Sequence, residues 1–398
     1  MPETRRLRWI AVSVLFLSSA LNYLDRSVLS ALMPTLRKEF GIGGAELGTL
    51  IAAFSITYAV SAPLMGLLID RFGLRYGASF VVGFWSMVSI GTGFAGGFGS
   101  LMAFRAMLGL AESGGIPCTG KGSAAYLEPR DRALGSAISQ IGISLGLSAA
   151  PILTEVVTAR FGWRSTFVVA GLLGFVWLPI WLWTSTRIPP GQIPGDPPKV
   201  PYGDMFRDRR FLTLIAANGL SMTVYSLWTT WPTLFLVNTF GITQEHANTG
   251  FVWIPPIFAT LGGLSGGLLA QRVIKEGIDP AAARIRISVI ASVFVLATGV
   301  APLAGSPALA TACICLSYFA LLIMSVNYYS IPLDLFGVGR AAFATSFLVS
   351  IYGFMQVFLA PLIGRWSDAA GWQPICLFVS VLPLTSALLL RSAFRRPA

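Results

Sequence analysis

Charged side chains are scarce in this sequence. Of its 398 residues only 11% are charged, while 55% are hydrophobic; a soluble globular domain carries about 25% charged residues. Cysteine and histidine are also rare, with four and one residues. The cysteines form no C-x-x-C pair and the lone histidine, His246, has no histidine partner, so we expect neither a disulfide framework nor a metal site. An ordinary soluble protein is excluded.

The chain also lacks the local motifs of common chemistries. No G-x-x-x-x-G-K-[ST] loop occurs, which argues against ATP-driven work by this chain alone. No nucleophile–base pair, metal cluster or cofactor loop falls within the apolar runs. We therefore expect that the protein is not an enzyme and that it needs no cofactor.

Long apolar runs dominate what is there. A membrane-spanning helix needs about 20 mostly apolar residues, and twelve stretches satisfy this. They lie roughly at 9–34, 46–69, 76–96, 99–125, 133–157, 165–185, 211–239, 248–271, 287–304, 307–331, 341–364 and 373–390. We expect an all-α membrane protein with twelve transmembrane helices. A cleaved secretory signal is disfavoured, because polar residues 22–26 interrupt the first run.

The excess of Lys and Arg over Asp and Glu reflects the orientation of the chain in the membrane. The formal net charge is +11, but most Lys and Arg residues lie in alternate loops and in the two tails. This is the positive-inside pattern, and it predicts that both termini are cytoplasmic in the cell inner (plasma) membrane. A nucleic-acid partner is not expected.

Three short matches indicate an internal repeat. GLLIDR at 66–71 matches GLLAQR at 267–272, and Gly162-Trp163 recurs at 371–372. Arg132-Ala133 recurs at 340–341, and the three offsets are all close to 200 positions. The chain therefore divides into two parallel six-helix halves around a proline-rich stretch. The predicted bounds are 1–187 for the N-terminal bundle, 188–208 for the cytoplasmic linker and 209–398 for the C-terminal bundle.

Ionisable residues within the apolar runs need a reason, because each costs at least about 2.5 kcal/mol at membrane depth. Asp25 and Arg26 lie in the first run, and Arg105 and Glu112 lie two turns apart in the fourth. The second half has no charge in any of its six runs. An arginine within an apolar run can bind a carboxylate, and an isolated acid in such a run can exchange a proton. The alternative is structural salt bridges between helices.

Other polar residues are candidates for the remainder of such a site. Lys121 either contributes to it or reaches the cytoplasmic interface, and Glu155 is expected at the interface. Hydroxyl, amide and aromatic groups suit a hydroxylated acid, although packing between helices is the favoured explanation for any one of them taken alone. These candidates are Tyr23, Tyr58, Gln140, Tyr225, Trp228, Trp231, Asn327, Tyr328, Tyr329 and Gln356.

The loop GLLIDRFGLRYG at 66–77 resembles the signature loop of the major facilitator superfamily. Its glycines, acid and basic residues fall on Gly66, Asp70, Arg71, Gly73 and Arg75. The resemblance implies that Asp70, Arg71 and Arg75 hold the cytoplasmic side closed. In the second copy, Gln271 replaces the acid, so gating there is weaker or made differently.

Within that superfamily, the chain resembles the anion:cation symporters. The resemblance rests on NYLDR at 22–26 with LSALMP at 29–34, and on RAMLGLAESGGIP at 105–117; IPCTGKGSAAYLEPRDRA at 116–133 is similar to the hexuronate and sugar-acid branch. It implies proton coupling at Asp25 and Glu112. It also implies anion binding by Arg26, with Tyr23, Tyr58 and Arg105 in support.

The sequence thus predicts a secondary active transporter for a small organic anion, such as a hexuronate, an aldonate or another small carboxylate, with protons as the coupling ion and sodium as an alternative. A single chain holds both halves, so we expect a functional monomer in the lipid bilayer. Two other hypotheses remain open: an anion exchanger or efflux carrier, and a transport-dead sensor of the same fold.

Overall fold

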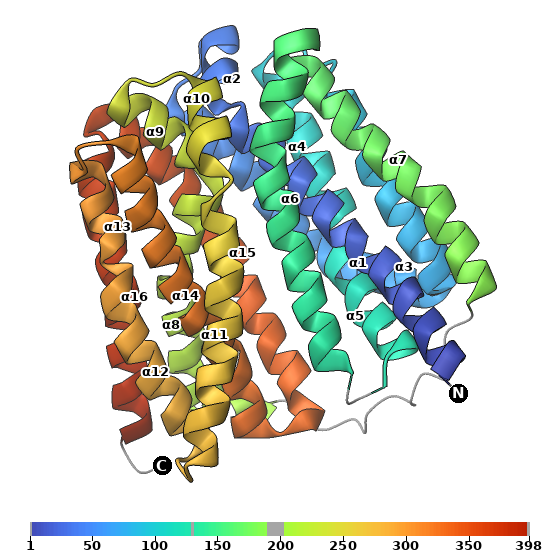
Figure 1. Ribbon diagram of the computed structural model, residues 1–398, viewed down its shortest axis with the longest axis vertical. Coiled ribbons are helices and arrows are strands. Elements are labelled where there is room, and N and C mark those ends of the chain that lie inside the picture. Colours follow the sequence, from blue (N-terminus) through green and yellow to red (C-terminus); the bar gives the residue numbers. More distant parts are fainter. Residues whose placement is uncertain (1, 129–130, 189–202, 396–398) are drawn as a thin grey trace. The chain divides into compact units, whose positions relative to one another are not determined.

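The computed structural model describes residues 2–128, 131–188 and 203–395, and the regular elements in these ranges are all helical. They form two compact units (Figure 1). Unit 1 contains the described residues up to Ile188 together with the segment Gln244–Trp253. Unit 2 contains the described residues from Gly203 onward, without that segment. Most of the predicted linker, 189–202, lies outside the described residues, and the predicted domain bounds stay a prediction.

Unit 1 is built from long helices that pack along their lengths. Helix α1 lies against α6 and α7, and α3 lies against α4 and α7. The elements are α1 (Pro2–Ala31), α2 (Met33–Phe40), α3 (Gly44–Thr92), α4 (Phe98–Glu112), α5 (Gly115–Tyr126), α6 (Arg132–Phe161), α7 (Trp163–Arg187), α10 (Gln244–Ala247) and the π-helix η2 (Asn248–Val252).

Unit 2 has the same all-helical construction. Figure 1 shows α11, α12, α14 and α16 running beside one another, and α8 packs against α14, α15 and α16. The elements are η1 (Gly203–Arg207), α8 (Arg209–Thr230), α9 (Pro232–Phe240), α11 (Pro255–Lys275), α12 (Pro280–Val295), α13 (Ala297–Val300), η3 (Ala301–Leu303), α14 (Pro307–Phe336), α15 (Val338–Ala369) and α16 (Trp372–Arg395).

Among the described residues, ten helices are long and apolar enough to cross a membrane. Two features separate this number from the predicted twelve. The second and third runs fall within one element, α3, which counts as a single span although its 49 residues form two helical parts joined at a kink, the non-helical Gly73 with φ of 77°. The fourth run is broken near Gly114 into α4 and α5, and each piece is shorter than a full span. The count of twelve stays a prediction.

Glycine permits one close helix contact in each unit. A Cβ at Gly109 of α4 would collide with the carbonyl oxygen of Phe54 in α3, and a Cβ at Gly262 of α11 would collide with that of Phe319 in α14. Such small residues let membrane helices approach closely. Phe54 and Gly262 are separated by 208 positions and Gly109 and Phe319 by 210, which matches the repeat offset. The same helix contact thus recurs in both halves. In unit 1 the glycine lies on the second helix of the pair, α4, and in unit 2 it lies on the first, α11.

Candidate functional site: a buried arginine–glutamate pair in unit 1

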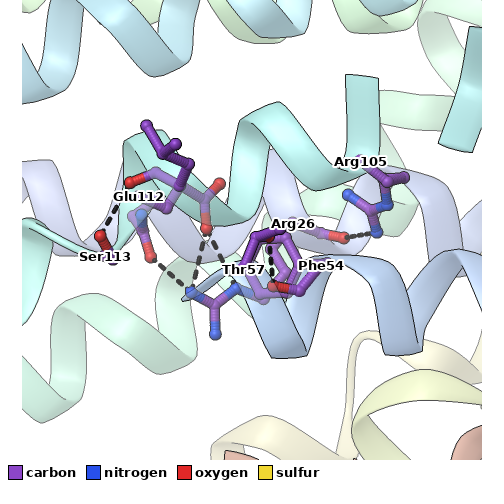
Figure 2. Close-up of polar contacts among 8 residues, drawn as sticks. Arg26, Phe54, Thr57, Arg105, Glu112 and Ser113 are labelled. Carbon is purple, nitrogen blue, oxygen red and sulfur yellow. Dashed lines mark hydrogen bonds and ion pairs between the residues drawn. The ribbon is translucent and has the colours of Figure 1, made fainter. Parts of the chain in front are cut away.

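An ion pair joins α1 to α4 (Figure 2). The carboxylate oxygen Oε2 of Glu112 accepts hydrogen bonds from Nη2 of Arg26 at 3.0 Å and from Nε at 3.2 Å. The Glu112 side chain is fully buried, whereas 26% of the Arg26 side chain is exposed. Nη2 also donates to the side-chain oxygen of Asn22, at 3.4 Å, one turn earlier on α1. The carboxylate of the pair is therefore shielded from solvent, whereas the guanidinium is partly accessible.

Aromatic rings surround the guanidinium. The Cζ atom of Arg26 lies 4.6 Å from the ring centre of Phe54, 4.9 Å from that of Tyr23 and 5.2 Å from that of Tyr58. Cation–π contacts of this kind favour the charged guanidinium where water is limited. The predicted residues Tyr23 and Tyr58 are thus brought to Arg26, and Phe54 completes the cradle.

Arg105 lies beside Arg26, but fewer of its N–H donors have hydrogen-bond partners. It is 3% exposed, its Nη2 donates to the backbone oxygen of Arg26 at 3.3 Å, and its Cζ lies 5.6 Å from the Phe54 ring. Its Nε and Nη1 are buried and have no hydrogen-bond partner among the described residues, and the same holds for Oε1 of Glu112. Since buried polar groups are normally hydrogen-bonded, these atoms mark the region as built for more than packing.

Asp25 faces a different neighbour from Arg26. It is 2% exposed, and its Oδ1 accepts a hydrogen bond of 2.5 Å from the hydroxyl of Ser89 in α3. Its Oδ2 has no hydrogen-bond partner in the described part of the chain. Of the two acids, Glu112 is therefore paired with an arginine, whereas Asp25 is hydrogen-bonded to a serine.

In the middle of α3, next to the non-helical Gly73, the signature loop makes an ion pair with α5. The Lys121 ammonium donates to Oδ1 of Asp70 at 2.6 Å and to the backbone oxygen of Ile69 at 3.3 Å. Arg71 and Arg75 lie against the rings of their own neighbours in the chain, at 5.9 and 5.2 Å. Lys121 is therefore the basic partner of the predicted gate acid, a role that sequence reasoning left open.

Glu155 is buried rather than surface-exposed. Its Oε1 accepts hydrogen bonds from Nε2 of Gln244 at 2.8 Å and from Nδ2 of Asn248 at 2.6 Å. Oε1 of Gln244 in turn accepts from the backbone N–H of Thr35 at 3.1 Å and from its hydroxyl at 2.8 Å. These bonds fix the segment 244–253 to α2 and α6. The partners Gln244 and Asn248 were missed because 89 and 93 positions separate them from Glu155.

Unit 2 contains one polar chain of neutral groups. The Ser226 hydroxyl donates to Oε1 of Gln356 at 2.6 Å, and Nε2 of Gln356 donates to the Tyr352 hydroxyl at 2.9 Å. The Tyr225 ring lies 5.7 Å from that of Tyr352. Tyr352 and Gln356 are four residues apart on α15, a spacing that could have indicated their contact.

Other predicted residues of the second half serve the core of unit 2. Trp228 is buried, and its indole N–H donates to the Thr298 hydroxyl at 3.0 Å. The hydroxyls of Tyr328 and Ser386, both buried, are 3.0 Å apart. Asn327 donates to the backbone oxygen of Ile323, one turn earlier, at 2.8 Å. In unit 1, Gln140 is half-buried on α6.

Comparison with known proteins identifies the fold. The model of the Major Facilitator Superfamily matches residues 15–348. The chain belongs to this superfamily. The structure of a bacterial homologue of the human lysosomal transporter Spinster, in an inward-facing and occupied conformation, matches with a TM-score of 0.75 at 18% identity. That match covers 97% of this chain and 96% of the other. The protein is thus a multi-pass membrane protein of a transporter family, and not an enzyme.

Relatives with assigned substrates are more similar in sequence than this structure, and they match over two thirds or more of this chain. The hexuronate transporter of Escherichia coli K12 is 26% identical over 98% of this chain and 94% of its own length. The galacturonate transporter of Dickeya chrysanthemi is also 26% identical, over 79% of this chain and 96% of its own. A probable galactarate/D-glucarate transporter of Bacillus subtilis is 27% identical over 68% and 66%. The resemblance to sugar-acid carriers seen in the motifs agrees with these matches.

Proposed function

We propose that this superfamily member is a secondary active transporter of the inner membrane that carries a sugar acid or another small carboxylate together with protons. The observation that carries the proposal is the Arg26–Glu112 pair, which has a buried acid and a partly exposed guanidinium. A guanidinium binds a carboxylate through two parallel N–H donors. The substrate carboxylate would therefore compete with Glu112 for Arg26.

Proton coupling follows from that competition. When Glu112 takes up a proton, it no longer attracts Arg26 as an anion, and the guanidinium becomes available to the substrate. When the substrate leaves, the acid releases its proton and the internal pair forms again. Asp25, whose partner is Ser89, is a second proton site in this proposal and does not need to release an arginine.

The names of the relatives support the substrate class. Three of them are described as carriers of hexuronate, galacturonate and galactarate or glucarate, which are all hydroxylated carboxylates. Arg26 supplies the charge that the carboxylate requires.

The test is uptake into liposomes that contain the purified full-length protein. With an inward proton gradient and no sodium, we expect accumulation of labelled galacturonate or galactonate, with lactate as a smaller comparator. R26K keeps the charge but loses the planar fork, so we expect at least a tenfold loss of uptake. R160Q removes an exposed arginine from the end of α6 and serves as the matched control with unchanged uptake.

The variant E112Q separates coupling from transport. It cannot cycle a proton at this position, so we expect exchange of labelled for unlabelled substrate to persist while gradient-driven accumulation is lost. Uptake that needs sodium instead of the proton gradient would contradict the coupling. Uptake that R26K leaves intact would contradict the anion site. Sealed vesicles that neither take up nor exchange any of the acids would favour the sensor hypothesis.

A further inference from the structure

Unit 2 has an apolar groove on its surface between α11, α12 and α14. Its volume is about 530 Å³. The lining is mostly aliphatic and aromatic, and several of its side chains are well exposed, among them Leu269, Ile290, Phe294 and Leu316. The charged residues in the lining are Arg286 and Glu276. Because these helices are long and apolar enough to span a membrane, the groove opens toward lipid rather than toward water.

A second groove of about 410 Å³ lies between α12 and α16. It shares Arg286 and Ile290 with the first, and it adds Arg391 and Phe394 from the end of α16. The two grooves therefore flank one face of α12 and meet at Arg286. Between Arg286 and Phe294 the helix rises about 12 Å, which gives the first groove the length of a substantial part of an acyl chain.

Arg286 and Arg391 differ in their contacts from the basic residues around them. Arg284 donates to Asp334 at 2.6 Å, and Arg210 is paired with Asp208 at 2.9 Å. Arg286 and Arg391, by contrast, have neither an ion pair nor a side-chain hydrogen bond within the described residues, Glu276 included. Two cations thus share one groove wall with apolar surface leading away from them, and neither is paired with Glu276, the acidic residue of the lining.

We propose that Arg286 and Arg391 bind the phosphate of an anionic phospholipid, whose acyl chains lie in the two apolar grooves beside α12. Guanidinium groups bind phosphate through several N–H donors at once. Anionic lipids collect at the cytoplasmic leaflet, which is the side that the positive-inside pattern predicts for these basic residues. An apolar partner alone would leave the arginines unpaired, and a free phosphate would leave the groove empty.

The test is native mass spectrometry of the delipidated full-length protein, titrated in detergent with phosphatidylglycerol. Each arginine near an anionic headgroup contributes about a fivefold gain in affinity. The variant R286Q/R391Q should therefore bind the first lipid about 30-fold more weakly. The double variant R272Q/K275Q removes the same charge from exposed positions at the end of α11 that line neither groove, and it should bind like the original protein.

Two further measurements address the groove and the ligand source. I290W keeps both arginines but fills the space that the two grooves share, so it too should weaken lipid binding. Phosphatidylcholine, and inorganic phosphate added as a competitor, should bind or compete at least tenfold less well. Equal binding by the two double variants, unchanged binding by I290W, or effective competition by inorganic phosphate would each overturn the proposal. Unchanged circular dichroism and monodispersity of each variant exclude misfolding as the cause.

Discussion

Removing the two members of the Arg26–Glu112 pair separately and together should reveal strong energetic coupling. Loss of one partner from a buried pair typically costs about 3–5 kcal/mol, because the other charge remains in a low-dielectric site. Glu112 is fully buried and Arg26 is 26% exposed, so the two single variants should not be equal. R26M, which strands the buried acid, should cost about 3–5 kcal/mol. E112Q leaves a partly solvated arginine and should cost about 1.5–3 kcal/mol, the value of a charge-assisted hydrogen bond.

The double variant R26M/E112Q removes both charges of the pair, so neither is left without the other, and it should cost about as much as R26M alone or less. The coupling free energy is then about 2 kcal/mol or more in favour of the pair. The assay is reversible unfolding of the full-length protein in mixed detergent micelles, followed by circular dichroism. An additive double variant, within about 0.5 kcal/mol, would refute the argument that these charges depend on each other.

An exposed pair in the same unit provides the control for this cycle. Arg164 and Glu39 are also 3.0 Å apart, but their side chains are 45% and 40% exposed. Surface pairs of this kind contribute about 0–1 kcal/mol. The cycle of R164M and E39Q should therefore show little coupling, even though the charge changes and the distance are the same. Similar coupling in both cycles would mean that burial is not the cause.

Two further substitutions test contacts that the structure reveals. G262A places a methyl group against the backbone oxygen of Phe319 and should lower the free energy of unfolding by about 1–3 kcal/mol; an unchanged value in the same assay would show that α11 and α14 can separate freely. N248L removes a hydrogen bond to the buried Glu155 and should cost about 1–3 kcal/mol, whereas T249V, which loses only a bond within its own turn, should be nearly neutral.

Much of the site was accessible from the sequence because charge is rare in a membrane span. Asp25, Arg26, Arg105 and Glu112 are conspicuous against an apolar background, and each of them is buried or partly buried in unit 1. Helical periodicity also placed Tyr23 on the side of Arg26, where the structure has it. Composition and spacing thus singled out Arg26, Arg105 and Glu112, which the structure brings together, and the family match confirmed the superfamily.

The pairing itself was not accessible. Asp25 and Arg26 are adjacent in sequence, but neighbouring residues on a helix point about 100° apart. One therefore meets Ser89 of α3 and the other meets Glu112 of α4. Only the packing of three helices decides which acid receives the arginine. The kink at Gly73, which divides α3 into two helical parts, falls between the second and third predicted runs.

Aromatic and amide residues in the second half were the hardest to interpret. Trp228 and Tyr328 carry polar atoms in apolar runs, exactly as a ligand site would require, and yet Thr298 and Ser386 satisfy them. A neutral polar group costs much less to bury than a charge once it has one hydrogen bond. Its presence in a span therefore carries less information than that of an arginine.

The proposed mechanism links stability to affinity at one pair. Because the substrate carboxylate must take the place of Glu112 at Arg26, every contact that strengthens the internal pair also weakens anion binding by the same free energy. Asn22 is such a contact, since its side-chain oxygen accepts a hydrogen bond from Nη2 of Arg26. A residue that holds the guanidinium toward Glu112 therefore restrains the empty carrier. The best-paired form of this site would be the poorest at binding its substrate.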